Sequence, residues 1–168
     1  NPSAYGLESW RALEPVVDRD LSARLSEVIS EARRAKDDDE LALMRMAAAA
    51  SRAGHLAGLR LARPDMTERE LQVEIEAAFF RSGADRTAYG SIVGSGPNGA
   101  VLHFSPTRRR LADGDLVLVD AGGEVDGYAS DVTRTYPVGR RFTGVQRDLY
   151  QLVLAVQESA IVAVRPGV

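Results

Sequence analysis

The sequence predicts an α+β domain in which helices cover an antiparallel sheet, and two observations carry this prediction. Two helical segments joined by a short link, residues 37–63 and 67–82, precede the first extended segments. Residues 115–137 then form two extended runs around an Asp-Gly pair, which is typical of a β-hairpin. Because paired helices must bury their apolar stripes, we expect them to lie on the sheet.

The first helical segment starts at a run of acidic residues and stops at a proline. Asp37 offers an N-cap oxygen, and the acidic residues up to Glu40 complement the positive end of the helix dipole. Pro64 ends the segment. Its stripe is expected to comprise Leu41, Met44, Ala48, Ser51, His55 and Leu59. We interpret His55 as a packed residue, because a lone histidine within a helix is more often packed than a ligand.

The second helical segment carries its own start and stop signals. Thr67 and Glu70 form a capping-box pattern, and Gly83 suits the left-handed residue that follows many helices. The link Arg63–Met66 is short, so the two segments are expected to form an αα-hairpin.

Residues 88–104 change in character, because glycines interrupt two short extended pieces. The string Gly94-Ser95-Gly96 lacks the glycine spacing of a dinucleotide fingerprint, which argues against a phosphate-binding role. Residues 100–104 predict a short strand with one titratable side chain, His103. Taken alone, His103 is as consistent with a structural role as with a catalytic one.

The expected hairpin, residues 115–137, carries an aspartate in each arm. Asp120 closes an apolar run, and Asp131 lies in the returning arm. A turn centred on Asp126-Gly127 would place Asp120 opposite Thr133, whereas a turn centred one residue earlier would place it opposite Asp131. Since side chains alternate between the faces of a strand, either register puts the two aspartates on the same face.

Two carboxylates on one face repel each other unless a proton or a cation lies between them. Cross-strand or diagonal neighbours lie roughly 4.5–8 Å apart, and facing like charges are destabilising. A shared proton, or one or two metal cations, would remove the repulsion between Asp120 and Asp131. The alternative, that one of them faces water at a strand end, stays open.

Composition narrows the class of protein. The 168 residues suffice for one domain with a core, and a net charge of −3 argues against a nucleic-acid partner. Because the sequence has no cysteine, any metal must be held by Asp, Glu or His. No apolar run approaches the roughly 18 residues of a membrane span, and no signal-peptide pattern opens the chain. We therefore expect a cytoplasmic protein with no membrane partner.

The two ends of the sequence suggest a piece of a longer protein. Residues 1–36 read as a linker or the tail of an upstream domain, with weak helical spacing near their end. Thr143 and Gln146 repeat the capping-box pattern before a last helix, whose Arg165-Pro166 ending echoes Arg63-Pro64. After the first such ending another helix follows, so we expect further sequence beyond Val168.

Several ordered motifs carry a resemblance to a known family. From about Asp38 onward the chain resembles the metal-dependent Xaa-Pro aminopeptidases of the pita-bread (creatinase/methionine aminopeptidase) superfamily. The motifs are Tyr89, Ser91–Gly96 with Asn98, Leu102-His103-Phe104, Gly114–Gly122, Gly127–Thr135, and Gln146-Arg147 with Tyr150. The resemblance implies that residues 37–168 form the N-terminal half of a pita-bread metallopeptidase domain.

The resemblance also implies roles for five residues. Asp120 corresponds to a carboxylate ligand of the first metal, and Asp131 to the carboxylate that bridges two metals. His103 corresponds to an imidazole that contacts substrate and helps stabilise or shuttle charge. Tyr89 and Thr133 correspond to hydroxyls that line the site.

The implied activity is release of the N-terminal residue from peptides with proline in the second position, through a hydroxide bridging two metal ions. Mn²⁺ is the expected metal, with Co²⁺ or Zn²⁺ as alternatives, and the full-length protein is expected to be a homo-oligomer. The family also uses a later histidine and two glutamates, for which this chain has no counterparts. The chain by itself is therefore expected to be inactive.

Two other functions stay open at this point. One is a prolidase-type dipeptidase, which is similar over the hairpin, and the other is a non-catalytic pita-bread interaction module. The presence of Asp120, Asp131 and His103 together favours an enzyme over the module, because a decayed site has no reason to keep two facing carboxylates.

Overall fold

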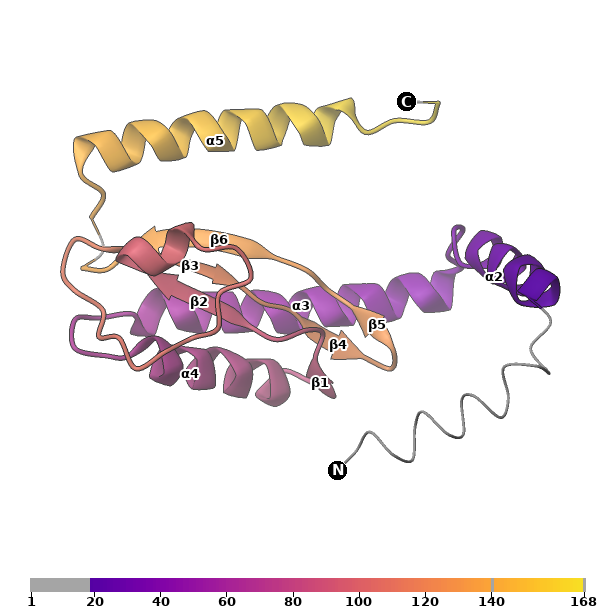
Figure 1. Ribbon diagram of the computed structural model, residues 1–168, viewed down its shortest axis with the longest axis horizontal. Helices are drawn as coiled ribbons and strands as arrows, with labels where there is room; N and C mark the ends of the chain where they lie inside the picture. Colours follow the sequence, from indigo (N-terminus) through magenta and orange to yellow (C-terminus); the bar gives the residue numbers. More distant parts are fainter. Residues whose placement is uncertain (1–18, 140, 168) are drawn as a thin grey trace. The chain divides into compact units, whose positions relative to one another are not determined.

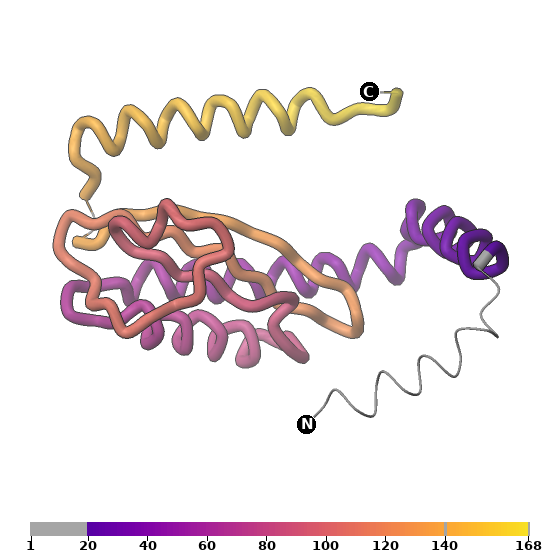
Figure 2. Tube along the Cα trace, in the orientation of Figure 1, coloured from indigo at the N-terminus to yellow at the C-terminus, as the bar shows by residue number. Residues whose placement is uncertain are grey.

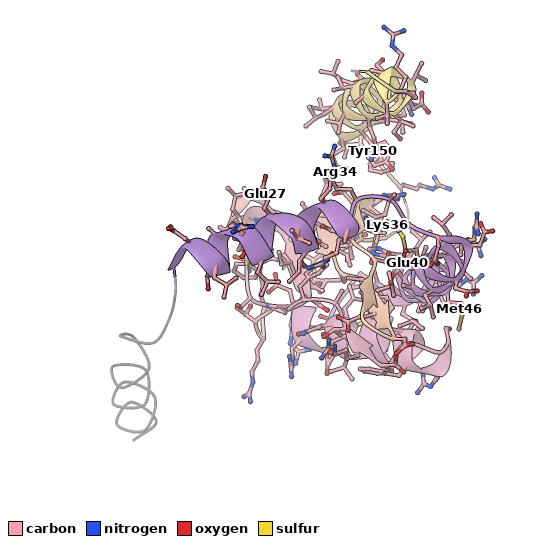
Figure 3. The ribbon with its side chains drawn as sticks, turned by 90° about the vertical axis from the view of Figure 1, so that its right-hand side faces the viewer. Glu27, Arg34, Lys36, Glu40, Met46 and Tyr150 are labelled. Atoms are coloured by element: carbon pink, nitrogen blue, oxygen red, sulfur yellow. The ribbon has the colours of Figure 1, made fainter. Side chains whose placement is uncertain are left out.

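The structure is a computed structural model that describes residues 19–139 and 141–167. The chain divides into two compact units, residues 1–41 and 42–168. In the first unit, helix α2 (Arg19–Ala32) confirms the helical spacing expected there, and residues 20–32 are all exposed. Glu27 and Arg34 mark this stretch in Figure 3. The predicted linker also includes residues 1–18, which lie outside the described residues.

The second unit contains the predicted αα-hairpin. Helix α3 (Asp38–Leu61) leads through a short link into α4 (Glu68–Arg81), and both run beside the strands in Figure 1. The capping box is confirmed, because the Thr67 side chain accepts from the Glu70 N–H while the Glu70 side chain accepts from the Thr67 N–H. Gly83 follows the helix with φ of 94°, as expected of a C′ glycine.

The buried stripe of α3 differs from the predicted one. It consists of Ala47, Ala50, Ser51, Gly54, His55 and Gly58, whereas Met44 and Leu59 are 38% and 47% exposed. The cause is the close approach of α4: a Cβ added at Gly54 would lie 2.1 Å from the Phe79 ring. Gly54 and Gly58 thus face α4, and larger residues such as Met46 (Figure 3) stay exposed. Ser51 and His55 instead form hydrogen bonds with the hairpin.

Two small antiparallel sheets follow, and the tube in Figure 2 traces their path. The first has the order β2-β3-β6 and the second the order β1-β4-β5. The strands are β1 (Arg86–Thr87), β2 (Ile92–Ser95), β3 (Leu116–Asp120), β4 (Gly123–Val125), β5 (Tyr128–Ala129) and β6 (Thr133–Pro137). The expected hairpin is therefore real, but its arms contribute to both sheets.

The hairpin register is the one centred on Asp126-Gly127. Asp126 and Gly127 have φ of 48° and 85°, so both occupy the left-handed region that a type I′ turn requires. Val125 pairs with Tyr128, and further along Asp120 pairs with Thr133. The alternative register, with Asp120 directly opposite Asp131, is wrong.

The strand predicted for residues 100–104 is also wrong. Residues 96–100 form a short 3₁₀ helix, η2 (Gly96–Ala100), and the following residues are turn and loop. Val101 and Leu102 are 54% and 91% exposed, so this apolar pair neither packs in the core nor joins a described strand. His103 has φ of 51°, which is incompatible with a regular strand.

The core lies between the helices and the β2-β3-β6 sheet. Most of the largest fully buried side chains are apolar, with Glu68 as the charged exception, and they include Leu71, Ile75, Phe79, Leu111, Val93, Val117 and Val119. The last helix, α5 (Gly144–Ala163), begins with the predicted capping box of Thr143 and Gln146, and none of its residues is buried. No helix in the described part of the chain is both long and apolar enough to cross a membrane.

Candidate metal centre

Two different backbone features position the two aspartates. Asp120 is the last residue of β3, where Val117 and Val119 point into the core and Asp120 is on the half-buried face. Asp131 lies just before β6, in a stretch that passes very close to the opposite arm of the hairpin. A Cβ at Gly122 would lie 1.7 Å from the Ser130 carbonyl oxygen, so only glycine allows this approach.

A tyrosine joins the two carboxylates. The Tyr89 hydroxyl lies 2.6 Å from Asp120 Oδ1 and 2.9 Å from Asp131 Oδ1. A phenol has one hydrogen to donate, so it can serve only one of these oxygens at a time. The observed geometry therefore brings both aspartates to one point, as the shared-face argument predicted. Burial, followed by the hydrogen bonds to these two carboxylates, raises the pKa of Tyr89, which keeps the phenol protonated.

A single pocket gathers most of the predicted site. Tyr89, His103, Asp120 and Asp131 all line it, together with Arg69, Gln72, the segment Gly90–Ile92 and the segment Phe104–Pro106. His103 reaches the pocket from a left-handed backbone position, a conformation that is uncommon outside glycine. Thr133 is the exception, because it is exposed and pairs with Asp120 across the ladder without lining this pocket.

The second histidine is placed elsewhere. His55 is 8% exposed, and its Nε2 donates to the Ala121 carbonyl oxygen over 2.9 Å. Burial lowers its pKa, which favours the neutral ring. The interpretation of His55 as a packed residue of α3 is therefore confirmed.

The donor set suits a hard divalent cation in type. Carboxylate oxygens are the ligands that Mn²⁺ and similar ions accept in proteins, and two carboxylates converge here. Among the residues that the structure describes, no group of three or more His, Asp or Glu side chains could hold a metal ion. Asp120 and Asp131 thus fit a metal in ligand type, but within the described residues they are not part of a group of three or more such ligands.

Sequence reasoning missed two charged residues at the start of α4: Arg69, which lines the pocket, and Glu68. Glu68, the first residue of α4, is fully buried, although a glutamate in a first helical turn is ordinarily a solvated charge. Its carboxylate accepts hydrogen bonds from Ser95, Asn98 and Thr107. Nothing in the local sequence signals this burial, because the three partners lie 27 to 39 residues further along.

Comparison with known proteins places this arrangement in a family. Residues 42–168 match the family described as metallopeptidase family M24. The chain belongs to this family. Its M24 relatives include the Xaa-Pro aminopeptidases of Escherichia coli, 43% identical over 83% of the chain, and of Haemophilus influenzae, 41% identical over 83% of the chain.

Solved structures agree with the family assignment. A variant of E. coli aminopeptidase P in complex with substrate matches with a TM-score of 0.80 and 42% identity over 83% of this chain and 32% of that chain. Proline aminopeptidase P II from Yersinia pestis matches with a TM-score of 0.75 and 44% identity over 79% of this chain and 30% of that one. The fold of this M24 chain is thus the α+β pita-bread fold of aminopeptidase P.

The match covers only part of each relative. The chain spans about a third of the length of the curated relatives, 32% of the E. coli protein and 33% of the H. influenzae protein. The predicted family and fold are confirmed over this part of the M24 domain.

Proposed function

We propose that the protein containing this M24 chain is a metal-dependent aminopeptidase that releases the N-terminal residue from peptides with proline in the second position. The observation that carries the proposal is the convergence of Asp120 and Asp131 on the Tyr89 hydroxyl, in a pocket that His103 also lines. The Xaa-Pro aminopeptidase relatives support the same activity.

In this proposal Asp120 and Asp131 would hold two divalent cations, and Asp131 would be the shared ligand. When bound, the cations would lower the pKa of water to supply the nucleophile, and they would polarise the scissile carbonyl. Mn²⁺ is the proposed metal on account of the oxygen ligands. Zn²⁺ and Co²⁺ are the alternatives, and one relative, E. coli aminopeptidase P, has been solved in a zinc-substituted form with product.

The remaining proposed roles belong to side chains that are not metal ligands. The protonated Tyr89 hydroxyl orients the two carboxylates by lying between them and donating to one of them at a time. His103 contacts substrate and stabilises or shuttles charge during cleavage, a role that general acid–base groups fill from hydrogen-bond distance. Thr133 adds a hydroxyl next to Asp120 in the β3–β6 ladder.

The proposal extends to the organisation of the whole protein. Residues 37–168 would form the N-terminal half of the catalytic domain, and residues 1–36 a linker or the tail of an upstream domain. Peptides with penultimate proline would be the substrates of a cytoplasmic homo-oligomer. Size-exclusion chromatography with light scattering, together with cell fractionation, tests the last two features.

The test uses the protein expressed from the whole reading frame and loaded with Mn²⁺. We expect it to cleave a tripeptide with penultimate proline, but neither the matched alanine tripeptide nor an Xaa-Pro dipeptide. Cleavage of the dipeptide alone would indicate a prolidase, and no cleavage of either proline substrate would contradict the proposal.

A pair of matched variants assigns the activity to the site. Asp131→Asn should lower kcat by at least about 100-fold, because a neutral amide is a much weaker bridging ligand. Asp126→Asn makes the same chemical change in the exposed turn and should retain full activity. Near-normal activity of Asp131→Asn would overturn the assignment.

A further inference from the structure

The buried Glu68 carboxylate contacts both ends of the loop that carries His103, residues 95–107. Glu68 Oε1 accepts from the Ser95 N–H over 2.9 Å, from the Ser95 hydroxyl over 2.7 Å and from Asn98 Nδ2 over 2.9 Å. Glu68 Oε2 accepts from the Thr107 N–H over 3.1 Å and from its hydroxyl over 2.6 Å. One oxygen therefore holds the start of the loop, and the other holds its end.

The backbone of α4 reinforces this contact. The Glu68 N–H donates to the Arg109 carbonyl and the Arg69 N–H to the Thr107 carbonyl, over 3.1 and 3.0 Å. The ribbon accordingly returns beside the start of α4 before it enters β3 (Figure 1). Arg109 Nη1 adds bonds to the Ser95 hydroxyl and to Asp115, over 2.6 and 2.7 Å.

The Glu68 carboxylate is charged at neutral pH. Burial raises its pKa, but the hydrogen bonds from Thr107, Asn98 and Ser95 together outweigh burial and leave the pKa below its ordinary value. Hydrogen bonds to a charged acceptor are stronger than those between neutral groups. The hydrogen bonds from Ser95, Asn98 and Thr107 to Glu68, which together form a clamp on the loop, are therefore charge-assisted.

The part of the loop between the clamped ends has little anchorage of its own. Val101 and Leu102 are 54% and 91% exposed, and His103 occupies a left-handed backbone conformation. Residues 103–106 nevertheless line the pocket with Asp120 and Asp131. The path that brings His103 to this pocket thus depends on where the two ends are held.

We propose that Glu68 is a positioning residue that sets the place of His103 at the metal centre by clamping both ends of this loop. This inference rests on the proposed aminopeptidase function. Glu68 does not line the pocket, so it acts through the loop and not on substrate. A glutamate that served only the stability of the fold would not be coupled to His103.

A double-mutant cycle on the whole Mn²⁺-loaded protein separates these two roles. Glu68→Gln replaces one acceptor oxygen with an amide NH₂ that faces donors, and we expect kcat to fall about 10- to 100-fold with a smaller change in KM. In the His103→Ala background the same change should lower kcat less than about threefold, because the residue it positions is gone. Equal losses in both backgrounds would overturn the proposal.

A milder variant decides the question if Glu68→Gln fails to fold. Thr107→Val removes the hydroxyl bond to Glu68 Oε2 and the bond that this hydroxyl accepts from the Arg109 N–H, and Thr107→Ser retains both. The control is Thr143→Val, which removes a comparable hydroxyl bond at the N-cap of α5. We expect kcat to fall several-fold in Thr107→Val alone, at a similar melting temperature to the control. Equal kcat in Thr107→Val and Thr143→Val would contradict the clamp.

Hydrogen exchange measures how firmly the loop is held, and it does so independently of catalytic activity. We expect peptides covering residues 101–106 to exchange faster in Thr107→Val and Glu68→Gln than in wild type, with exchange in β3 unchanged. If the wild-type protein cleaves no Xaa-Pro peptide but residues 101–106 still exchange faster in the variants, the proposed function is wrong and the clamp is supported. If the protein cleaves Xaa-Pro peptides but neither exchange nor kcat changes in the variants, the clamp is wrong and the proposed function is unaffected.

Discussion

Asp120 lies opposite Thr133 in the β3–β6 ladder, and this register leaves Asp131 one step diagonal to it on the same face. The diagonal arrangement opens space between the two carboxylates, which the Tyr89 hydroxyl reaches over 2.6 and 2.9 Å. The register is fixed by the Asp126-Gly127 turn, whose two residues both have positive φ. The backbone conformation of this turn thus sets the spacing of the proposed metal ligands.

Removal of the Tyr89 hydroxyl should loosen this pair. Tyr89→Phe takes away the donor between two like charges, so we expect a loss of about 1 kcal/mol in unfolding free energy without metal. We also expect an affinity for Mn²⁺ about tenfold weaker, because the carboxylates lose the group that orients them. Calorimetric titration measures the affinity. Tyr150→Phe, which keeps the ring against Phe142, serves as the control and should change neither quantity.

The close approach at Gly122 should not tolerate a side chain. Gly122→Ala places a Cβ 1.7 Å from the Ser130 carbonyl oxygen, and we expect the hairpin to shift at a cost of about 2 kcal/mol or more. Gly144→Ala makes the same change in open space at the start of α5 and should be neutral or stabilising by about 0.5 kcal/mol. Urea unfolding compares the two, and equal stabilities would contradict the described geometry.

The buried Glu68 carboxylate predicts a pH dependence of stability. Its pKa in the folded protein lies below its ordinary value of 4.5, so the folded state binds fewer protons there than the unfolded state does. The contribution of Glu68 is therefore complete above pH 4.5 and is lost as the pH falls through the folded pKa. Urea unfolding of wild type between pH 3 and 7 should show this loss. Glu68→Gln should be less stable at pH 7 and show a shallower decline, and parallel curves would refute the assignment.

The exposed apolar residues of α5 predict how the isolated 168-residue chain behaves. Leu149, Leu152, Val153 and Val156 are all between 57% and 63% exposed. Because contiguous apolar surface of this kind promotes association, we expect the isolated chain to self-associate. We also expect it to lack peptidase activity, because its described residues include no group of three or more possible metal ligands. Light scattering measures the association, and a stable monomer at micromolar concentration would count against this expectation.

Local signals were enough to predict the αα-hairpin, the last helix and the β-hairpin of this fold. The Thr67 and Thr143 capping boxes start their helices where predicted, and the Asp-Gly pair marks the turn, although it left two registers open. These features depend on hydrogen bonds between residues a few positions apart, which the sequence displays directly. The same-face argument for Asp120 and Asp131 succeeded because strand alternation is equally local.

Features that depend on distant partners could not be predicted. The apolar run Val101-Leu102 reads as a strand, but no described strand pairs with it, and it stays at the surface. The buried side of α3 is set by Phe79 pressing against Gly54, which an apolar stripe cannot reveal. Glu68 is buried by partners on a loop that only the tertiary fold brings to it.

The central claim is that Asp120 and Asp131 are metal ligands, and the Mn²⁺ content of the whole protein tests it most directly. After equilibration with Mn²⁺ and removal of the free ion, elemental analysis should find two Mn²⁺ per chain in wild type and in Asp126→Asn. We expect at most one in Asp120→Asn and in Asp131→Asn, because a carboxylate ligand is lost in each. Two Mn²⁺ per chain in either of these variants, held as tightly as in wild type, would contradict the account.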